Sequence, residues 1–150
     1  MILQTDKRLA EERPPIKPYG CAFMSMAYNA NKYHGYELGI PQIVAAYDDC
    51  VEERIMSSDC FIHSWHGLAE YFRFELMKQA PVHRPGDYVC ENDEFEILLW
   101  RLNRGQGKEW RHFVAGNGKG ITTYDPWGVS LTATTGILDS KRIFKLVLCG

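Results

Sequence analysis

Apolar residues recur three and four positions apart in the first half of the chain, which is the spacing of one helical face. The first such stripe predicts a helix over residues 21–31 that stops near Gly35. A second helix is predicted over residues 41–55, where a proline occupies the favoured first position. A third helix is predicted over residues 64–76, with Ser64 as its N-cap.

The segment before these helices has a different character. Three of the seven prolines lie within residues 11–18. Proline lacks the backbone N–H that a regular helix or a central strand requires. We therefore expect residues 1–20 to form an extended, loop-like lead-in to the first helix.

The second half of the chain changes to short apolar or alternating segments bounded by Gly, Asn and Asp, a pattern typical of strands. The turn Asn117–Gly120 separates two of these segments and favours a hairpin, because Asn and Gly tolerate positive φ. The pattern predicts an α+β fold, with N-terminal helices packed on a C-terminal antiparallel sheet. The predicted strands are residues 95–102, 111–115, 120–124 and 142–148.

Composition narrows the class of protein. The chain has 150 residues, of which 45% are hydrophobic and 24% charged, so we expect one globular domain over residues 1–150. A net charge of −2 without a basic stripe argues against a nucleic-acid partner. No apolar stretch approaches the roughly 18 residues that a membrane span needs, so no membrane span is expected.

The five cysteines are odd in number and irregularly spaced. Reduced thiols are therefore expected rather than a disulfide framework. The first residues lack the charged and then apolar pattern of a secretory signal. Both observations favour a cytoplasmic location, with release by another route left open.

Gly20 and Cys21 open the first predicted helix. At this position the helix dipole favours a thiolate, and free backbone N–H groups are available to an oxyanion. The position therefore favours a nucleophile. The other interpretation of Cys21 is a structural cysteine, since a free thiol also behaves as a small buried hydrophobe.

His112 opens a predicted strand whose hairpin neighbour ends at Asp125. A hairpin brings these ends side by side, so that the carboxylate can fix the tautomer and orientation of the imidazole. Alone, the segment Asp125-Pro-Trp-Gly indicates only a turn. With Cys21, the pair predicts the layout of a papain-like cysteine hydrolase.

The other four histidines compete for the role of base. His34 and His83 lie in turn-like segments and are expected to be solvated. His63 and His66 lie near the start of the third predicted helix, where capping or packing is the expected role.

A zinc site is an alternative role for two of these histidines, His63 and His66. Cys50, Cys60, His63 and His66 are ligand types that zinc accepts. Their spacing fits no common zinc-finger pattern, so core cysteines and surface histidines are expected instead. No metal or other cofactor is predicted.

Four short motifs carry a family resemblance: Gln4-Thr-Asp-Lys-Arg-Leu-Ala, Tyr19-Gly-Cys-Ala-Phe-Met-Ser-Met-Ala, His112-Phe-Val-Ala-Gly and Tyr124-Asp-Pro-Trp. Together they resemble bacteriocin-processing-type (C39-like) cysteine peptidases of the papain-like superfamily. The resemblance implies a papain-like fold with Cys21 as nucleophile, His112 as base and Asp125 as the group that orients the base. It also implies that Gln4 donates a hydrogen bond in the oxyanion hole. The chain departs from these relatives at Ala22-Phe23, where they carry Gly-Pro or a similar pair.

The expected function is therefore cofactor-free hydrolysis of a peptide or related amide bond through a thioester. The expected substrate is a peptide, a protein or a cell-wall peptide. One alternative is a catalytically inactive papain-like binding or assembly module, and another is a transferase that passes the acyl group to an amine. The short chain is compatible with a protein carried by a phage or mobile element. Three tryptophans are candidate groove walls or core aromatics: Trp65, Trp110 and Trp127.

Overall fold

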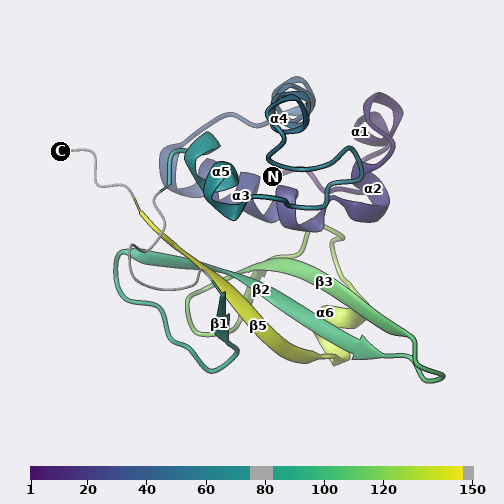
Figure 1. Cartoon of the computed structure of the whole chain (residues 1–150), viewed down its shortest axis with the longest axis vertical. Coiled ribbons are helices and arrows are strands. Elements are labelled where there is room, and N and C mark those ends of the chain that lie inside the picture. Colours follow the sequence, from purple (N-terminus) through teal and green to yellow (C-terminus); the bar gives the residue numbers. More distant parts are fainter. Residues whose placement is uncertain (75–82, 147–150) are drawn as a thin grey trace.

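A layer of helices covers one face of an antiparallel sheet (Figure 1) in the computed structural model, which describes residues 1–74 and 83–146. The predicted α+β architecture is therefore confirmed. The helices of the described residues are α1 (Lys7–Glu12), α2 (Ile16–Tyr19), α3 (Cys21–His34), α4 (Ile40–Glu52), α5 (Trp65–Tyr71) and α6 (Leu131–Thr135).

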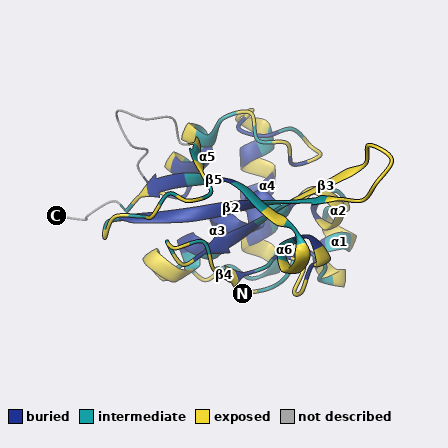
Figure 2. Cartoon of the chain, turned by 90° about the horizontal axis from the view of Figure 1, so that it is seen from below, coloured by how far each residue is buried: buried dark blue, intermediate teal, exposed yellow. Residues whose placement is uncertain are grey.

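The sheet has the strand order β1-β5-β2-β3-β4, and each neighbouring pair is antiparallel. The central strand β2 is buried over most of its length (Figure 2), while α6 packs against β2 and β3. The strands are β1 (His83–Pro85), β2 (Glu94–Asn103), β3 (Glu109–Gly116), β4 (Thr122–Tyr124) and β5 (Ile137–Lys145).

The main core lies between the helical layer and the sheet. From α3 it takes Phe23 and Met26, which are fully buried, and from β2 it takes Phe95 and Ile97. Rings stack within it, with Phe95 and Phe144 centred 5.3 Å apart. Burying apolar side chains of this size stabilises the fold by about 1.5–3 kcal/mol each. The core therefore fixes α3 against the sheet.

The helix predicted over residues 21–31 is confirmed as α3, which runs three residues further. It ends where Gly35 takes φ 70° and its N–H donates to the carbonyl of Asn31. A left-handed residue at this position is the usual helix stop, and glycine adopts it without a Cβ clash.

The other two predicted helices are also confirmed. α4 begins at Ile40, and α5 begins after Ser64, whose side chain accepts the N–H of Gly67 as an N-cap. α5 ends at Tyr71, earlier than predicted, and residue 76 lies outside the described residues.

The prediction of an extended lead-in over residues 1–20 is wrong, because two short helices form there. Asp6 caps α1 by accepting the N–H of Arg8. Pro15 is the N-cap of α2, and Pro18 lies in its first turn. N–H groups of a first turn have no intrahelical acceptor, so proline loses nothing at these positions.

The predicted hairpin is confirmed, and each predicted strand overlaps an observed strand. The last one, predicted over residues 142–148, begins earlier, at Ile137, and ends at Lys145, while residues 147 and 148 lie outside the described residues. Asn117 closes the β3–β4 hairpin by donating its N–H to the carbonyl of Ile121. Gly118 and Gly120 take φ 94° and 82°, the conformations that glycine was expected to supply. No helix within residues 1–74 and 83–146 combines the length and apolar character that crossing a membrane requires.

Candidate active site

Cys21 is the first residue of α3 and is half-buried beside a pocket. Gly20 joins α2 to α3 so tightly that a Cβ on it would lie 2.6 Å from the carbonyl oxygen of Ile16. Only glycine fits at that distance from backbone. The thiol is thereby held at the N-terminus of α3, beside the first backbone N–H groups of this helix.

The first turns of α3 lie along β3. Ser25, one turn after Cys21, is fully buried and donates from Oγ to the carbonyl of Phe113 at 3.4 Å. His112 is the neighbour of Phe113 in the strand. This docking brings the N-terminus of α3 next to the strand that carries the imidazole.

His112 and Asp125 meet across the β3–β4 hairpin. The Nε2 atom of His112 lies 2.7 Å from Oδ1 of Asp125, and the two side chains are only 12% and 7% exposed. The sequence prediction that the hairpin ends pair this imidazole and carboxylate is therefore matched by the geometry.

Further donors hold the carboxylate of Asp125 in place. Oδ1 also accepts the N–H of Trp127 at 2.9 Å, while Oδ2 accepts the N–H and the hydroxyl of Ser130 at 3.1 and 2.6 Å. A carboxylate with this many donors is fixed in orientation and favoured as the anion.

The electrostatics of the pair favour a charged imidazole. Desolvation by burial lowers the pKa of His112, but hydrogen bonds to Asp125 and Cys21 outweigh it and raise the pKa to about 9. Desolvation raises the pKa of Asp125, but hydrogen bonds from His112 and Ser130 hold it below the ordinary value. Near neutral pH the pair is therefore an imidazolium and a carboxylate.

Gln4 is almost completely buried against α2, the helix that precedes Cys21. Its Nε2 atom donates to the carbonyl of Lys17 at 2.7 Å and to that of Ile16 at 3.4 Å. One amide hydrogen is firmly bound and the other only weakly. A part in the oxyanion hole requires the weakly held hydrogen to turn toward the substrate, so this role stays a prediction.

Ser130 belongs to the candidate site, although the sequence did not predict it. It holds Asp125 and also caps α6, because its Oγ accepts the N–H of Ala133 at 3.2 Å. The available signal was a serine placed five residues after the aspartate, before a short run of threonines.

The start of the chain completes the surroundings of Asp125. The hydroxyl of Tyr124 donates to the carbonyl of Ile2 at 2.7 Å, and the N–H of Gln4 donates to the carbonyl of Pro126 at 2.9 Å. The candidate site is therefore built from the start of the chain, the N-terminus of α3, strand β3 and residues 124–130.

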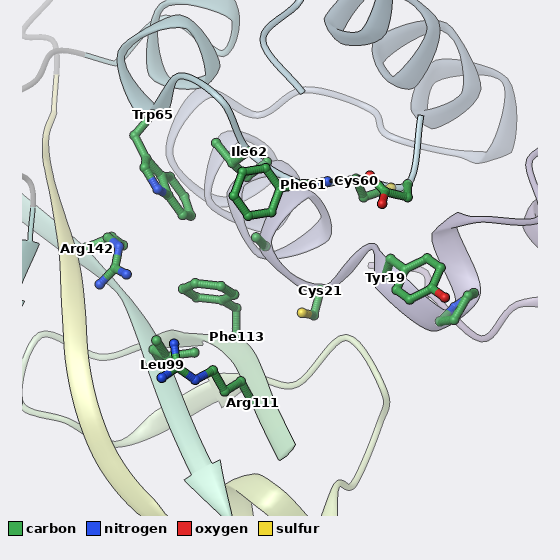
Figure 3. Close-up of a pocket in the computed structure, with 13 residues that line it drawn as sticks. Tyr19, Cys21, Cys60, Phe61, Ile62, Trp65, Leu99, Arg111, Phe113 and Arg142 are labelled. Carbon is green, nitrogen blue, oxygen red and sulfur yellow. Dashed lines mark hydrogen bonds between the residues drawn. The ribbon is translucent and has the colours of Figure 1, made fainter. Parts of the chain in front are cut away.

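A pocket of about 460 Å³ opens beside Cys21 between the helices and the sheet (Figure 3). The sulfur of Cys21 is directed toward the side where Phe113 lies. Among the candidate groove tryptophans, Trp65 lines this pocket, whereas Trp110 and Trp127 are surface residues exposed by 48% and 42%.

The four residues considered as zinc ligands differ in their surroundings. Cys50 and Cys60 are buried, and burial raises the pKa of each thiol to about 12. His63 and His66 are exposed. In the part of the chain that the structure describes, no three His, Cys, Asp or Glu side chains come together as a metal site.

Two of the histidine predictions differ from the structure. His34 was expected to be solvated, but it is half-buried with its ring stacked 4.5 Å from that of Phe74. Phe74 lies after the end of α5, and its buried ring reaches the last residue of α3, a long-range contact that the sequence position of His34 does not indicate. His83 is exposed as expected, although it lies in β1.

Comparison with known proteins assigns the chain to a family. It belongs to the family described as "Protein of unknown function, DUF261", whose model matches residues 1–146. No curated protein and no solved structure matches the chain.

Proposed function

We propose that this protein is a cysteine hydrolase that cleaves a peptide or related amide bond through a thioester on Cys21. The observation that carries the proposal is the hydrogen bond between His112 and Asp125, together with the effect of the nearby Cys21 in raising the pKa of the same imidazole. A thiol, an imidazole and a carboxylate in this order are the elements of nucleophilic catalysis by cysteine. The resemblance to C39-like peptidases of papain-like fold supports the same assignment.

The orientation of the ring defines the proton path. Because Nε2 of His112 faces Asp125, Nδ1 is the nitrogen left for the thiol. Before the substrate arrives, His112 already holds the proton of Cys21 as an imidazolium, and the thiolate forms a bond to the substrate carbonyl carbon. The imidazolium then protonates the leaving amine as the C–N bond breaks, which leaves the acyl group as a thioester.

Water completes the cycle. Neutral His112 takes a proton from water as the hydroxide attacks the thioester, and the carboxylic acid leaves as the thiolate re-forms. Both steps pass through an oxyanion, for which the backbone N–H of Cys21 and the amide of Gln4 are the proposed donors. No cofactor is needed for these steps.

Thiol labelling tests the proposal without knowledge of the substrate. Cys90 is a suitable internal control, since it is half-buried like Cys21 but burial raises its pKa to about 12. We expect iodoacetamide at pH 7 to modify Cys21 at least about tenfold faster than Cys90. His112→Ala should slow the reaction of Cys21 and leave Cys90 unchanged, as followed by mass spectrometry of the cysteine peptides.

The same experiment decides between the proposal and an inactive binding or assembly module. Equal labelling of Cys21 and Cys90 would contradict the hydrolase and favour the module. Where Cys21 is selectively reactive, a peptidyl electrophile should label it, and prior treatment with iodoacetamide should block that labelling. Product analysis with an added amine then separates a hydrolase from a transferase.

A further inference from the structure

The pocket beside Cys21 has an uneven distribution of charge. Its sheet side carries two guanidinium groups, Arg111 of β3 and Arg142 of β5. Figure 3 shows both arginines on the same side of the pocket as Phe113, across from the helix that carries Cys21.

Arg142 is half-buried, and no carboxylate of the described residues forms an ion pair with it. Its guanidinium lies 5.8 Å from the ring centre of Trp65 and 5.6 Å from that of Phe113, and its Nη1 donates to Ser140 Oγ at 3.1 Å. Within residues 1–74 and 83–146, no carboxylate oxygen comes within 4.0 Å of its nitrogens. Burial lowers the pKa of Arg142, because removing the guanidinium from water costs free energy while it stays charged.

The nearby acids are committed to other groups. Glu109 pairs with Arg111 at 2.8 Å, and Asp139 is bound by Arg101 at 3.4 Å. Asp59, which lines the pocket from the loop before α5, is hydrogen-bonded to Ser57. The charge of Asp139 still acts on Arg142 and raises its pKa, and Ser140 bridges the two side chains. Among the described residues, however, no carboxylate forms a direct ion pair with Arg142, so its guanidinium keeps N–H donors for a ligand at the pocket wall.

We propose that the pocket binds a carboxylate of the substrate beside the bond that Cys21 attacks. This inference rests on the proposed function and names its substrate class as peptides that carry a carboxylate, from a chain terminus or an acidic side chain, close to the bond that is cleaved. The guanidinium of Arg142 supplies a bidentate partner for the carboxylate. The rings of Trp65 and Phe113 supply an apolar surface for the carbon chain that carries the carboxylate.

Two alkylating agents of nearly equal size test the charge of the pocket. Iodoacetate carries a carboxylate where iodoacetamide carries a neutral amide. With either reagent, the Cys21 thiolate forms a bond to the CH₂ carbon and iodide leaves. The ratio of the two rate constants at Cys21 therefore reports attraction of the carboxylate, while the iodoacetamide rate alone reports activation of the thiol.

Replacing Arg142 should change that ratio in a charge-dependent way. We expect Arg142→Gln to lower the iodoacetate-to-iodoacetamide ratio on the order of fivefold, because one unit charge is lost near the reacting carbon. Arg142→Lys should keep most of the ratio. Lys108→Gln, which removes one positive charge from an exposed loop, is the control and should leave the ratio within about twofold.

The outcomes separate this inference from the proposed function. A selectively reactive Cys21 with a ratio unaffected by Arg142→Gln overturns the carboxylate pocket and leaves the hydrolase intact. An unreactive Cys21 overturns the hydrolase, and the pocket is then decided by binding to Cys21→Ala. The same binding measurement decides the matter if Arg142→Gln does not fold.

That measurement follows the side-chain Nε–H resonance of Arg142 by NMR in Cys21→Ala. N-acetylglutamine carries only an α-carboxylate, and N-acetylglutamic acid α-amide carries only a side-chain carboxylate. We expect a saturable shift with at least one of these isomers and none with the neutral diamide. The tighter isomer identifies whether a chain terminus or an acidic side chain is bound, and no shift with either overturns the inference.

Discussion

The charge of Asp125 should control the protonation of His112, and Asp125→Asn tests this directly. Asn has the same shape and can keep its oxygen toward Nε2 of His112 and the N–H of Trp127. Its NH₂ group then faces the N–H of Ser130, which loses its acceptor. We therefore expect a folded variant that is less stable by about 1–3 kcal/mol.

The magnitude of the electrostatic change follows from the pKa of His112. Asp125 contributes the larger of the two hydrogen bonds that raise this pKa to about 9 against desolvation. Without the carboxylate charge, the pKa should fall toward the ordinary value of about 6.5. At pH 8 the imidazolium fraction would then drop from about 0.9 to as little as about 0.03, a change of up to about 30-fold.

The assay is an NMR titration of the ring carbon protons of the five histidines in the wild type and the variant. The exposed residues His63 and His66 serve as internal references, since neither contacts Asp125 in the structure. The wild type should give one histidine with a midpoint near pH 9. That resonance should be absent from His112→Gln and should move to lower pH in Asp125→Asn.

Two results would refute the reasoning. One is a His112 midpoint near pH 6.5 in the wild type, which would mean that the contacts with Asp125 and Cys21 do not overcome desolvation. The other is a midpoint that stays near pH 9 in Asp125→Asn, which would mean that the carboxylate charge is not the cause of the shift.

Two further predictions concern the helix junction and the pH dependence of stability. Gly20→Ala should destabilise the protein by about 1–3 kcal/mol and slow the labelling of Cys21, because the new Cβ meets the backbone oxygen of Ile16 at 2.6 Å. Gly39→Ala, at the N-cap of α4, meets the movable end of a side chain; as a weaker N-cap it should cost at most about 1 kcal/mol and should leave the labelling of Cys21 unchanged. The raised pKa of His112 contributes about 3 kcal/mol of stability below pH 6.5 that is lost as the pH rises through about 9. Urea unfolding between pH 6.5 and 10 should therefore show a steeper loss in the wild type than in Asp125→Asn, and equal slopes would contradict this.

The parts of the site that the sequence predicted are those with local signals. The apolar stripe after Cys21 marked the start of α3, and Asn117 marked the hairpin that pairs His112 with Asp125. Each signal lies within a few residues of the structure it specifies, because helix periodicity and turn conformation are short-range properties.

The parts that the sequence did not predict depend on contacts between distant segments. Arg142 reaches the pocket only because β5 pairs with β2, and no local pattern distinguishes it from other strand arginines. The side chain of Gln4 binds the carbonyls of α2, a helix that the proline content had argued against. Ser130 became a partner of Asp125 through a turn whose shape the sequence left open.

The hydrogen bond from Tyr124 to Ile2 joins residues 122 positions apart in the chain. During translation the first residues leave the ribosome long before the hairpin that supplies His112 and Asp125. A nascent or truncated chain therefore holds the thiol of Cys21 without its base. Only a chain that extends past Ser130 can assemble the proposed reactive centre, so shorter products would carry the thiol without the imidazole and carboxylate proposed to activate it.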